Sequence, residues 1–131
     1  MANFNKIIYA VIILILVCMG ISQPRFSVFG EGENKLVHFK DSSFLVQVAE
    51  TKQQQAEGLM FVKSLPPDSG MLFIYKDEAP RTFHMKNTYI PLDIIWLDEE
   101  KRVVFIKKNA EPESPDACES IHPQAEAMYV L

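Results

Sequence analysis

Cysteine and glycine are scarce in this sequence of 131 residues, which contains two cysteines and five glycines. Cys18 lies in an apolar N-terminal segment, so Cys118 is the only thiol expected in the folded part, and no intramolecular disulfide is available there. The core must therefore be stabilised by packing, which a chain of this length can supply. We expect Cys118 to be a small half-buried residue or to pair with another molecule. The scarce glycines form no phosphate-binding loop.

Basic residues are also in deficit, with 13 Lys and Arg against 17 Asp and Glu and a formal net charge of −4. This balance disfavours nucleic acid as a partner, because such binding depends on basic groups that meet phosphates. It also provides no polybasic surface for anionic lipids. With 48% hydrophobic and 23% charged residues, the composition is that of an ordinary globular protein.

The longest apolar run is at the N-terminus, where residues 7–21 carry no charge and follow Lys6. A basic residue followed by such a run is typical of a secretory signal. Fifteen apolar residues are few for a membrane-spanning helix, which needs about 20. We therefore interpret residues 1–22 as a signal peptide or an uncleaved signal anchor, and both remain open. The protein is expected to be exported to the periplasm or another extracytoplasmic space, with membrane contact through 7–21 if the segment stays uncleaved.

The rest of the chain is predicted to be a linker at 23–34 and a single β-rich domain at 35–131, without internal repeats. Thr51 followed by Gln54 fits a capping box, so a short helix is expected over 52–59 and ends near Gly58. Short apolar or alternating runs at a spacing of about ten residues indicate a mainly antiparallel sheet or a small barrel. The predicted strands are 37–39, 44–50, 71–75, 81–86, 92–97, 102–107 and 127–131, and a loop is expected over 109–125. The fold class is thus mainly β (β-rich α+β), with one short helix, preceded by an N-terminal apolar helix.

Several short motifs of this domain occur together in one known family. They are Gly58-Leu-Met60, Ser64-Leu-Pro66, Gly70-Met-Leu-Phe73, His84-Met-Lys-Asn-Thr88, Pro91-Leu-Asp93, Asn109-Ala110 and Tyr129-Val-Leu131. On these motifs, residues 43–131 resemble the domain-of-unknown-function family 192, also called uncharacterised ACR. The resemblance implies a small β-rich domain, exported in many members, with no settled activity.

Two departures from the family pattern affect what the resemblance implies. Members commonly have an Arg after Gly-Leu-Met-Phe, where this sequence has Val62, so an anion-binding role for that position is not carried over. Members also continue beyond Tyr-Val-Leu with another strand, a helix and a Gly-Asp turn, whereas this sequence stops at Leu131. We therefore expect the domain to be truncated at its C-terminus.

The candidate ligand-binding surface starts from residues 81–86. In an extended segment, Phe83 and Met85 point to one side, and Thr82, His84 and Lys86 point to the other. A His beside a Lys can present donors to an anion or a carbonyl group. The alternative is a solvated sheet face, since any half-exposed strand shows such alternation.

Asp93 completes this surface, together with Asn87. We expect Asp93 to lie among apolar neighbours on a strand covered on both sides, where a carboxylate needs a partner. One interpretation is structural, with Asp93 accepting hydrogen bonds from the backbone of the Asn87–Thr88 turn. The other is functional, with Asp93 as a general acid, a base or a ligand anchor paired with Lys86 or Arg81. Gly58, Leu59, Met60, Thr88 and Pro91 are interpreted as structural parts of the motifs.

Methionine and histidine raise a third possibility, a copper(I) site built from soft sulfur and imidazole. His84 and Met85 are expected to point in opposite directions, and no Met-x-Met, His-x-His or Cys-x-x-Cys spacing exists. Methionine as a core residue explains the pattern better, so we expect no metal and no cofactor. Cys118 and His122 are close in sequence, but nothing in the sequence orients them for catalysis.

The sequence thus favours a non-catalytic ligand-binding or accessory module of the cell envelope. Its partner would be an envelope ligand or protein rather than nucleic acid. The alternative is a small hydrolase or transferase that uses Asp93 with His84 or Lys86. A Met/His copper-binding protein is the third and least favoured alternative.

Overall fold

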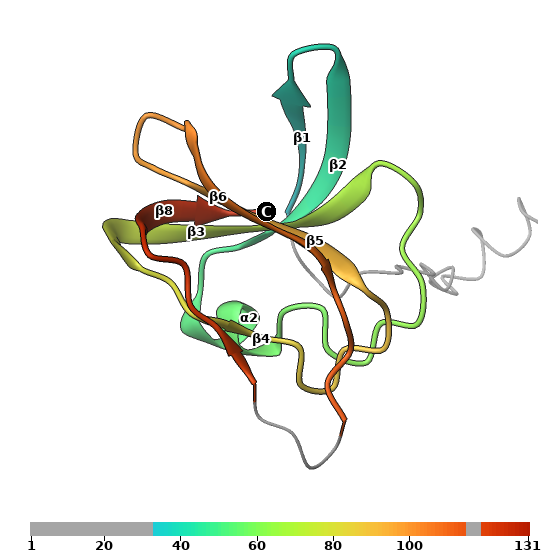
Figure 1. Ribbon diagram of the computed structural model, residues 1–131. Helices are drawn as coiled ribbons and strands as arrows, with labels where there is room; N and C mark the ends of the chain where they lie inside the picture. Colours follow the sequence, from blue (N-terminus) through green and yellow to red (C-terminus); the bar gives the residue numbers. More distant parts are fainter. Residues whose placement is uncertain (1–32, 115–118) are drawn as a thin grey trace, which may run out of the picture.

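The computed structural model describes residues 33–114 and 119–131 (Figure 1). Within those residues the chain is mainly β with one short helix, as predicted. Its elements are β1 (Asn34–Phe39), β2 (Ser42–Ala49), α2 (Lys52–Glu57), β3 (Ser69–Pro80), β4 (Phe83–His84), β5 (Leu92–Leu97), β6 (Val103–Ala110), β7 (Ser120–Ile121) and β8 (Glu126–Val130).

Six of these strands form one sheet in the order β1-β2-β3-β8-β5-β6, and β4 pairs with β7 in a second, two-stranded sheet. The large sheet has β1 and β6 at its edges and does not close, so the barrel alternative is wrong. All neighbours are antiparallel except β2 and β3, which are parallel. Parallel strands need a crossover connection, and the segment that carries α2 supplies it.

The main hydrophobic cluster lies on one side of the large sheet, and Trp96 of β5 is fully buried within it. Alternation along β5 buries Ile94 and Trp96 on this side, with Leu92 partly buried beside them. Phe83 and Phe105 make edge-on ring contacts with Trp96 at centroid distances of 5.6 and 5.2 Å. The cluster thus joins β4 to the large sheet, and α2 and β4 lie on the same side of that sheet in Figure 1.

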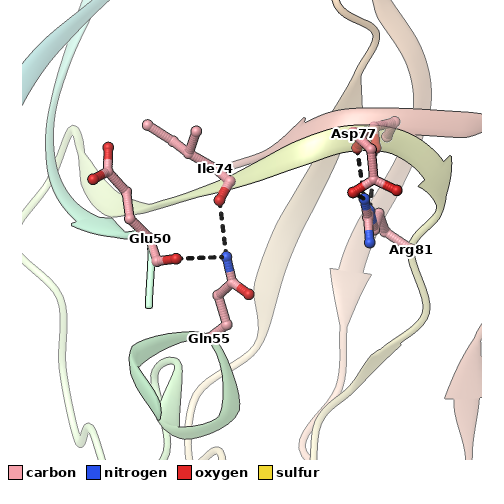
Figure 2. A network of polar contacts seen from close by, with 6 residues as sticks. Glu50, Gln55, Ile74, Asp77 and Arg81 are labelled. Carbon is pink, nitrogen blue, oxygen red and sulfur yellow. Dashed lines mark hydrogen bonds and ion pairs between the residues drawn. The ribbon is translucent and has the colours of Figure 1, made fainter. Parts of the chain in front are cut away.

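The helix α2 forms as its cap predicts. The Gln54 backbone N–H donates to the Thr51 hydroxyl at 3.2 Å, and the Thr51 backbone N–H donates to the Gln54 side chain at 3.0 Å. Because the helix buries no residue, it is held by a polar contact instead. The Gln55 side-chain amide donates to the Ile74 carbonyl of β3 at 2.8 Å and to the Glu50 carbonyl at 3.4 Å (Figure 2). This contact places the C-terminal end of α2 beside the core.

Several predicted boundaries need correction. The Lys-Asp-Glu-Ala-Pro stretch expected to follow the strand at 71–75 instead continues β3, with an irregular register between Ile74 and Ala79. The strand predicted over 81–86 is only β4, because Arg81 and Lys86 lie outside the ladder. The loop expected over 109–125 contains the end of β6 and all of β7. The strand predicted at 37–39 begins earlier, since Asn34 starts β1 and the Glu33 carbonyl already accepts the Val48 N–H.

The predicted signal segment at 1–22 and Cys118 lie outside the described residues. Among residues 33–114 and 119–131, no helix combines the length and the apolar character of a membrane span.

Candidate functional site

A pocket of about 590 Å³ opens between α2 with its following loop, the β4 segment and the large sheet. Most of its lining is apolar and comes from segments far apart in the sequence. Among the apolar lining residues are Leu59, Met60, Met71, Phe73, Phe83, Met85, Ile94 and Val130. A pocket of this size and character accommodates a small organic molecule.

Most of the residues predicted to form a ligand surface line this pocket. Thr82, His84, Lys86 and Asp93 belong to its lining, and Asn87 does not. The motif residues interpreted as structural also line it, and these are Gly58, Leu59, Met60, Thr88 and Pro91. Burial agrees with the predicted alternation, because Met85 is buried whereas Thr82, His84 and Lys86 are exposed.

Gly58 closes α2 with a backbone conformation that other residues avoid. Its φ and ψ are 48° and −134°, and a Cβ at this position would lie 3.4 Å from the Phe73 ring. The absent side chain therefore permits both the turn and the close approach to β3. The motif Gly58-Leu-Met60 thereby brings Leu59 and Met60 to the pocket.

The loop after α2 meets the turn after β4. The Phe61 N–H donates to the Asn87 carbonyl at 2.7 Å, and both residues have positive φ, 64° and 57°. Asn87 adopts the left-handed conformation that asparagine tolerates in turns. The rings of Phe61 and Tyr89 lie edge-on at 6.0 Å and are 61% and 52% exposed.

The two-stranded sheet supports the polar side of the pocket through two imidazole–hydroxyl contacts. His84 Nδ1 lies 3.2 Å from Ser120 Oγ, and Thr82 Oγ1 lies 3.1 Å from His122 Nδ1. Sequence reasoning missed Ser120 and His122 as partners because the contacts span 36 and 40 residues. Pairing of Phe83 with Ile121 sets this register.

Asp93 differs from its predicted environment. It is exposed rather than covered on both sides, and its Oδ1 accepts the Asn109 backbone N–H at 2.8 Å. The prediction that Asp93 binds the backbone of the Asn87–Thr88 turn is therefore wrong. The register of β5 against β6 shifts next to Asp93, between Leu92 and Ile94, and the Asp93 carboxylate takes part in this irregular pairing.

Neither predicted cationic partner of Asp93 forms an ion pair with it among the described residues. Arg81 instead donates to the Asp77 carboxylate at 3.0 Å (Figure 2), and its guanidinium lies 4.0 Å from the centre of the Tyr75 ring. The Arg81 carbonyl accepts the Trp96 indole N–H at 2.8 Å. Burial raises the pKa of Tyr75, and the charge of Arg81 opposes that rise. Arg81 therefore has a structural role, because it contacts both β3 and Trp96 of β5.

Glu113 holds the β4 segment from the other side and was also missed. Its Oε1 accepts the Met85 backbone N–H at 2.9 Å, across 28 positions of sequence. Its Oε2 is buried without a hydrogen-bond partner in the described part of the chain. No group of three His, Cys, Asp or Glu side chains suited to hold a metal is found within 33–114 and 119–131.

One family model matches most of this chain. Residues 35–131 match the model of domain-of-unknown-function family 192, uncharacterized ACR. A crystal structure of a candidate transcription regulator from Sinorhizobium meliloti 1021 is 34% identical, with a TM-score of 0.62, over 67% of this chain and 66% of that one. A protein of unknown function from Novosphingobium aromaticivorans DSM 12444 is 33% identical, with a TM-score of 0.65, over 72% and 67%. No curated protein matches. This chain therefore spans about two thirds of the length of these solved structures.

Proposed function

Since the chain belongs to the uncharacterized ACR family, whose description specifies no reaction, we propose from its pocket that it is a non-catalytic module that binds a small ligand. One observation carries the proposal. Thr82, His84, Lys86 and Asp93, singled out for their chemistry, line the same largely apolar pocket. An apolar pocket with a few polar groups at its wall is the usual form of a small-molecule site.

The polar groups of this pocket favour binding over catalysis. Nucleophilic catalysis needs a nucleophile bonded to a base that a third group orients. His84 contacts Ser120, but no hydrogen bond in the described residues connects His84 to Asp93 or Lys86. Asp93 instead accepts the Asn109 N–H. The hydrolase or transferase alternative therefore lacks an oriented set of groups.

One observation supports the copper alternative, and another argues against it. Met60, Met71, Met85 and His84 all line the pocket. However, Met85 is buried while His84 is exposed, as expected of side chains that point in opposite directions along one segment. The methionines are explained more simply as the flexible apolar lining of a ligand pocket.

Export and a place in the cell envelope remain part of the proposal. They rest on the apolar run at 7–21, whose structure is not described. The Sinorhizobium meliloti relative, a candidate transcription regulator, raises DNA as a possible partner. The net charge of −4 for the whole chain argues against direct binding of DNA.

An uncharged fluorescent probe tests the pocket directly. N-phenyl-1-naphthylamine should bind with enhanced fluorescence, because the apolar lining removes its rings from water. Met60→Trp places a larger ring at the pocket wall and should weaken binding by about tenfold, or about 1.4 kcal/mol. Val104→Trp introduces the same ring at an exposed position of β6 outside the pocket lining and should have no effect.

Absence of probe binding to the folded protein, or equal binding by both variants, would contradict the proposal. Circular dichroism checks that each variant is folded. The hydrolase alternative would be favoured if the protein cleaved p-nitrophenyl acetate and if Asp93→Asn abolished this turnover without unfolding the domain.

A further inference from the structure

From the charged and apolar groups that line the pocket, we infer that its ligand is an amphiphile with an apolar body and an anionic head. The head lies at His84 and Lys86, and the body lies on the apolar lining. This inference rests on the proposed function, because it names the ligand class of the same pocket.

The body of the ligand follows from the lining. Met60, Met71 and Met85 reach the pocket from three separate segments, and Phe73 and Phe83 add ring surface. Methionine side chains adapt to different apolar shapes because they are unbranched and flexible. Such a surface gains free energy mainly by removing apolar groups of a ligand from water. A strongly polar body would lose its hydration without replacement hydrogen bonds.

The head follows from two polar groups, one on β4 and one in the turn after it. Lys86 lines the pocket, is exposed, and makes no ion pair or hydrogen bond with any of the described residues. His84 uses Nδ1 for its contact with Ser120, which leaves Nε2 for a ligand. Both side chains are exposed and line the same pocket, His84 from β4 and Lys86 from the turn that follows it. They can bind one anionic group together.

Two carboxylates also line the pocket, and each already receives a hydrogen bond from the protein. Asp93 accepts the Asn109 N–H at 2.8 Å, and Glu57 accepts the Gln53 side-chain amide at 3.1 Å. Both lie on other elements, β5 and α2. The one lining ammonium group thus has no partner among the described residues, whereas both lining carboxylates accept a hydrogen bond from a neutral donor and keep their charge. An anionic head satisfies the unpartnered group.

The test compares three ligands with the same ten-carbon body at pH 7.5: decanoate, decanol and decylamine. Each displaces N-phenyl-1-naphthylamine from the full chain, and the displacement gives its dissociation constant. We expect decanoate to bind about tenfold more tightly than decanol, and decylamine to bind most weakly. In Lys86→Met the ratio of the dissociation constant of decanol to that of decanoate should fall to about one, because the head then loses its ionic partner.

Lys108→Met is the matched control, since Lys108 is exposed on β6 and does not line the pocket. It should keep the selectivity of the unaltered protein. Equal or tighter binding of decylamine, or unchanged selectivity in Lys86→Met, overturns the anionic head while the pocket still binds. Absence of binding by the uncharged probe itself overturns the proposed function instead, so the two failures are distinguishable.

Discussion

At the scale of single residues, glycine and asparagine mark where the pocket wall turns. Gly58 ends α2 in a conformation that only glycine adopts readily, and Asn87 supplies the left-handed turn after β4. Phe61 has a similar φ without being suited to it. The two loops that carry these residues are joined by the bond between Phe61 and Asn87.

Gly58→Ala should destabilise the domain by about 1–3 kcal/mol, because a Cβ strains this backbone and approaches the Phe73 ring. Gly70→Ala is the matched control, since the nearest atom to its added Cβ is Leu131 Cδ1 at 3.8 Å, an ordinary contact. Its stability should change by less than about 1 kcal/mol. Urea unfolding followed by circular dichroism measures both. Equal stability of the two variants would refute the role assigned to Gly58.

At the scale of elements, the hairpin between β5 and β6 is held by one carboxylate. Asp98 Oδ1 accepts the Arg102 backbone N–H at 2.8 Å, and Oδ2 accepts the Arg102 side chain at 2.7 Å. Burial by itself raises the pKa of Asp98, but the hydrogen bonds and charge of Arg102 outweigh it and lower the pKa below its ordinary value. The hairpin is thus stabilised by the ionised form.

The lowered pKa predicts how stability depends on pH. A carboxyl group with a lower pKa in the folded state stabilises the fold above its unfolded pKa, about 4, and this stabilisation is lost as pH falls through the folded pKa. Asp98→Asn should therefore be less stable than the unaltered protein at pH 7, and the difference should shrink towards pH 3. Urea unfolding across this range measures it. Glu99→Gln, an exposed change in the same turn, should show no such trend, and a constant deficit for Asp98→Asn would contradict the assignment.

At the scale of the whole molecule, the pocket depends on bonds between segments distant in sequence. Glu113 binds the Met85 N–H across 28 positions, and Gln55 binds the Ile74 carbonyl across 19. Met85 lies outside the β4–β7 ladder, and Ile74 lies where the register of β3 against β8 becomes irregular. The two contacts hold two walls of the pocket, the β4 segment and α2, against the large sheet.

Glu113→Ala should loosen the β4 segment, because the Met85 N–H loses its acceptor at a cost of about 1–3 kcal/mol. Amide hydrogen exchange should rise over residues 82–89, and N-phenyl-1-naphthylamine should bind more weakly. Glu113→Gln keeps the accepting oxygen and should behave nearly as the unaltered protein. Exposed Glu126→Ala on β8 is the control for a lost carboxylate. Exchange over 82–89 that stays unchanged in Glu113→Ala would contradict this role.

Much of the local structure was predictable because it depends on near neighbours in the chain. The capping box of Thr51 and Gln54 and the end of α2 at Gly58 are confirmed. So is the alternation that exposes His84 and Lys86 and buries Met85. The same logic overestimated the strand at 81–86, since alternation says which side a residue faces but not whether a partner strand is present.

The partners of the polar side chains were not predictable in this way. Asp93 was expected in a buried strand near the Asn87–Thr88 turn, but it is exposed and bound to Asn109. Ser120 as partner of His84 lay within a stretch without periodicity, which was predicted to be a loop. Contacts of this kind depend on the register between distant strands, and this register cannot be predicted from the sequence of either segment alone.

The sequence by itself determined the fold class, the family, the short helix and the side on which the pocket residues face, because these follow from spacing along the chain. The tertiary structure alone decided that β2 and β3 run parallel, that the large sheet stays open, and that Thr82, His84, Lys86 and Asp93 line one pocket. Those features arise when segments far apart in sequence compete for the same partners. The outcome is set by the packing of the whole domain rather than by any local pattern.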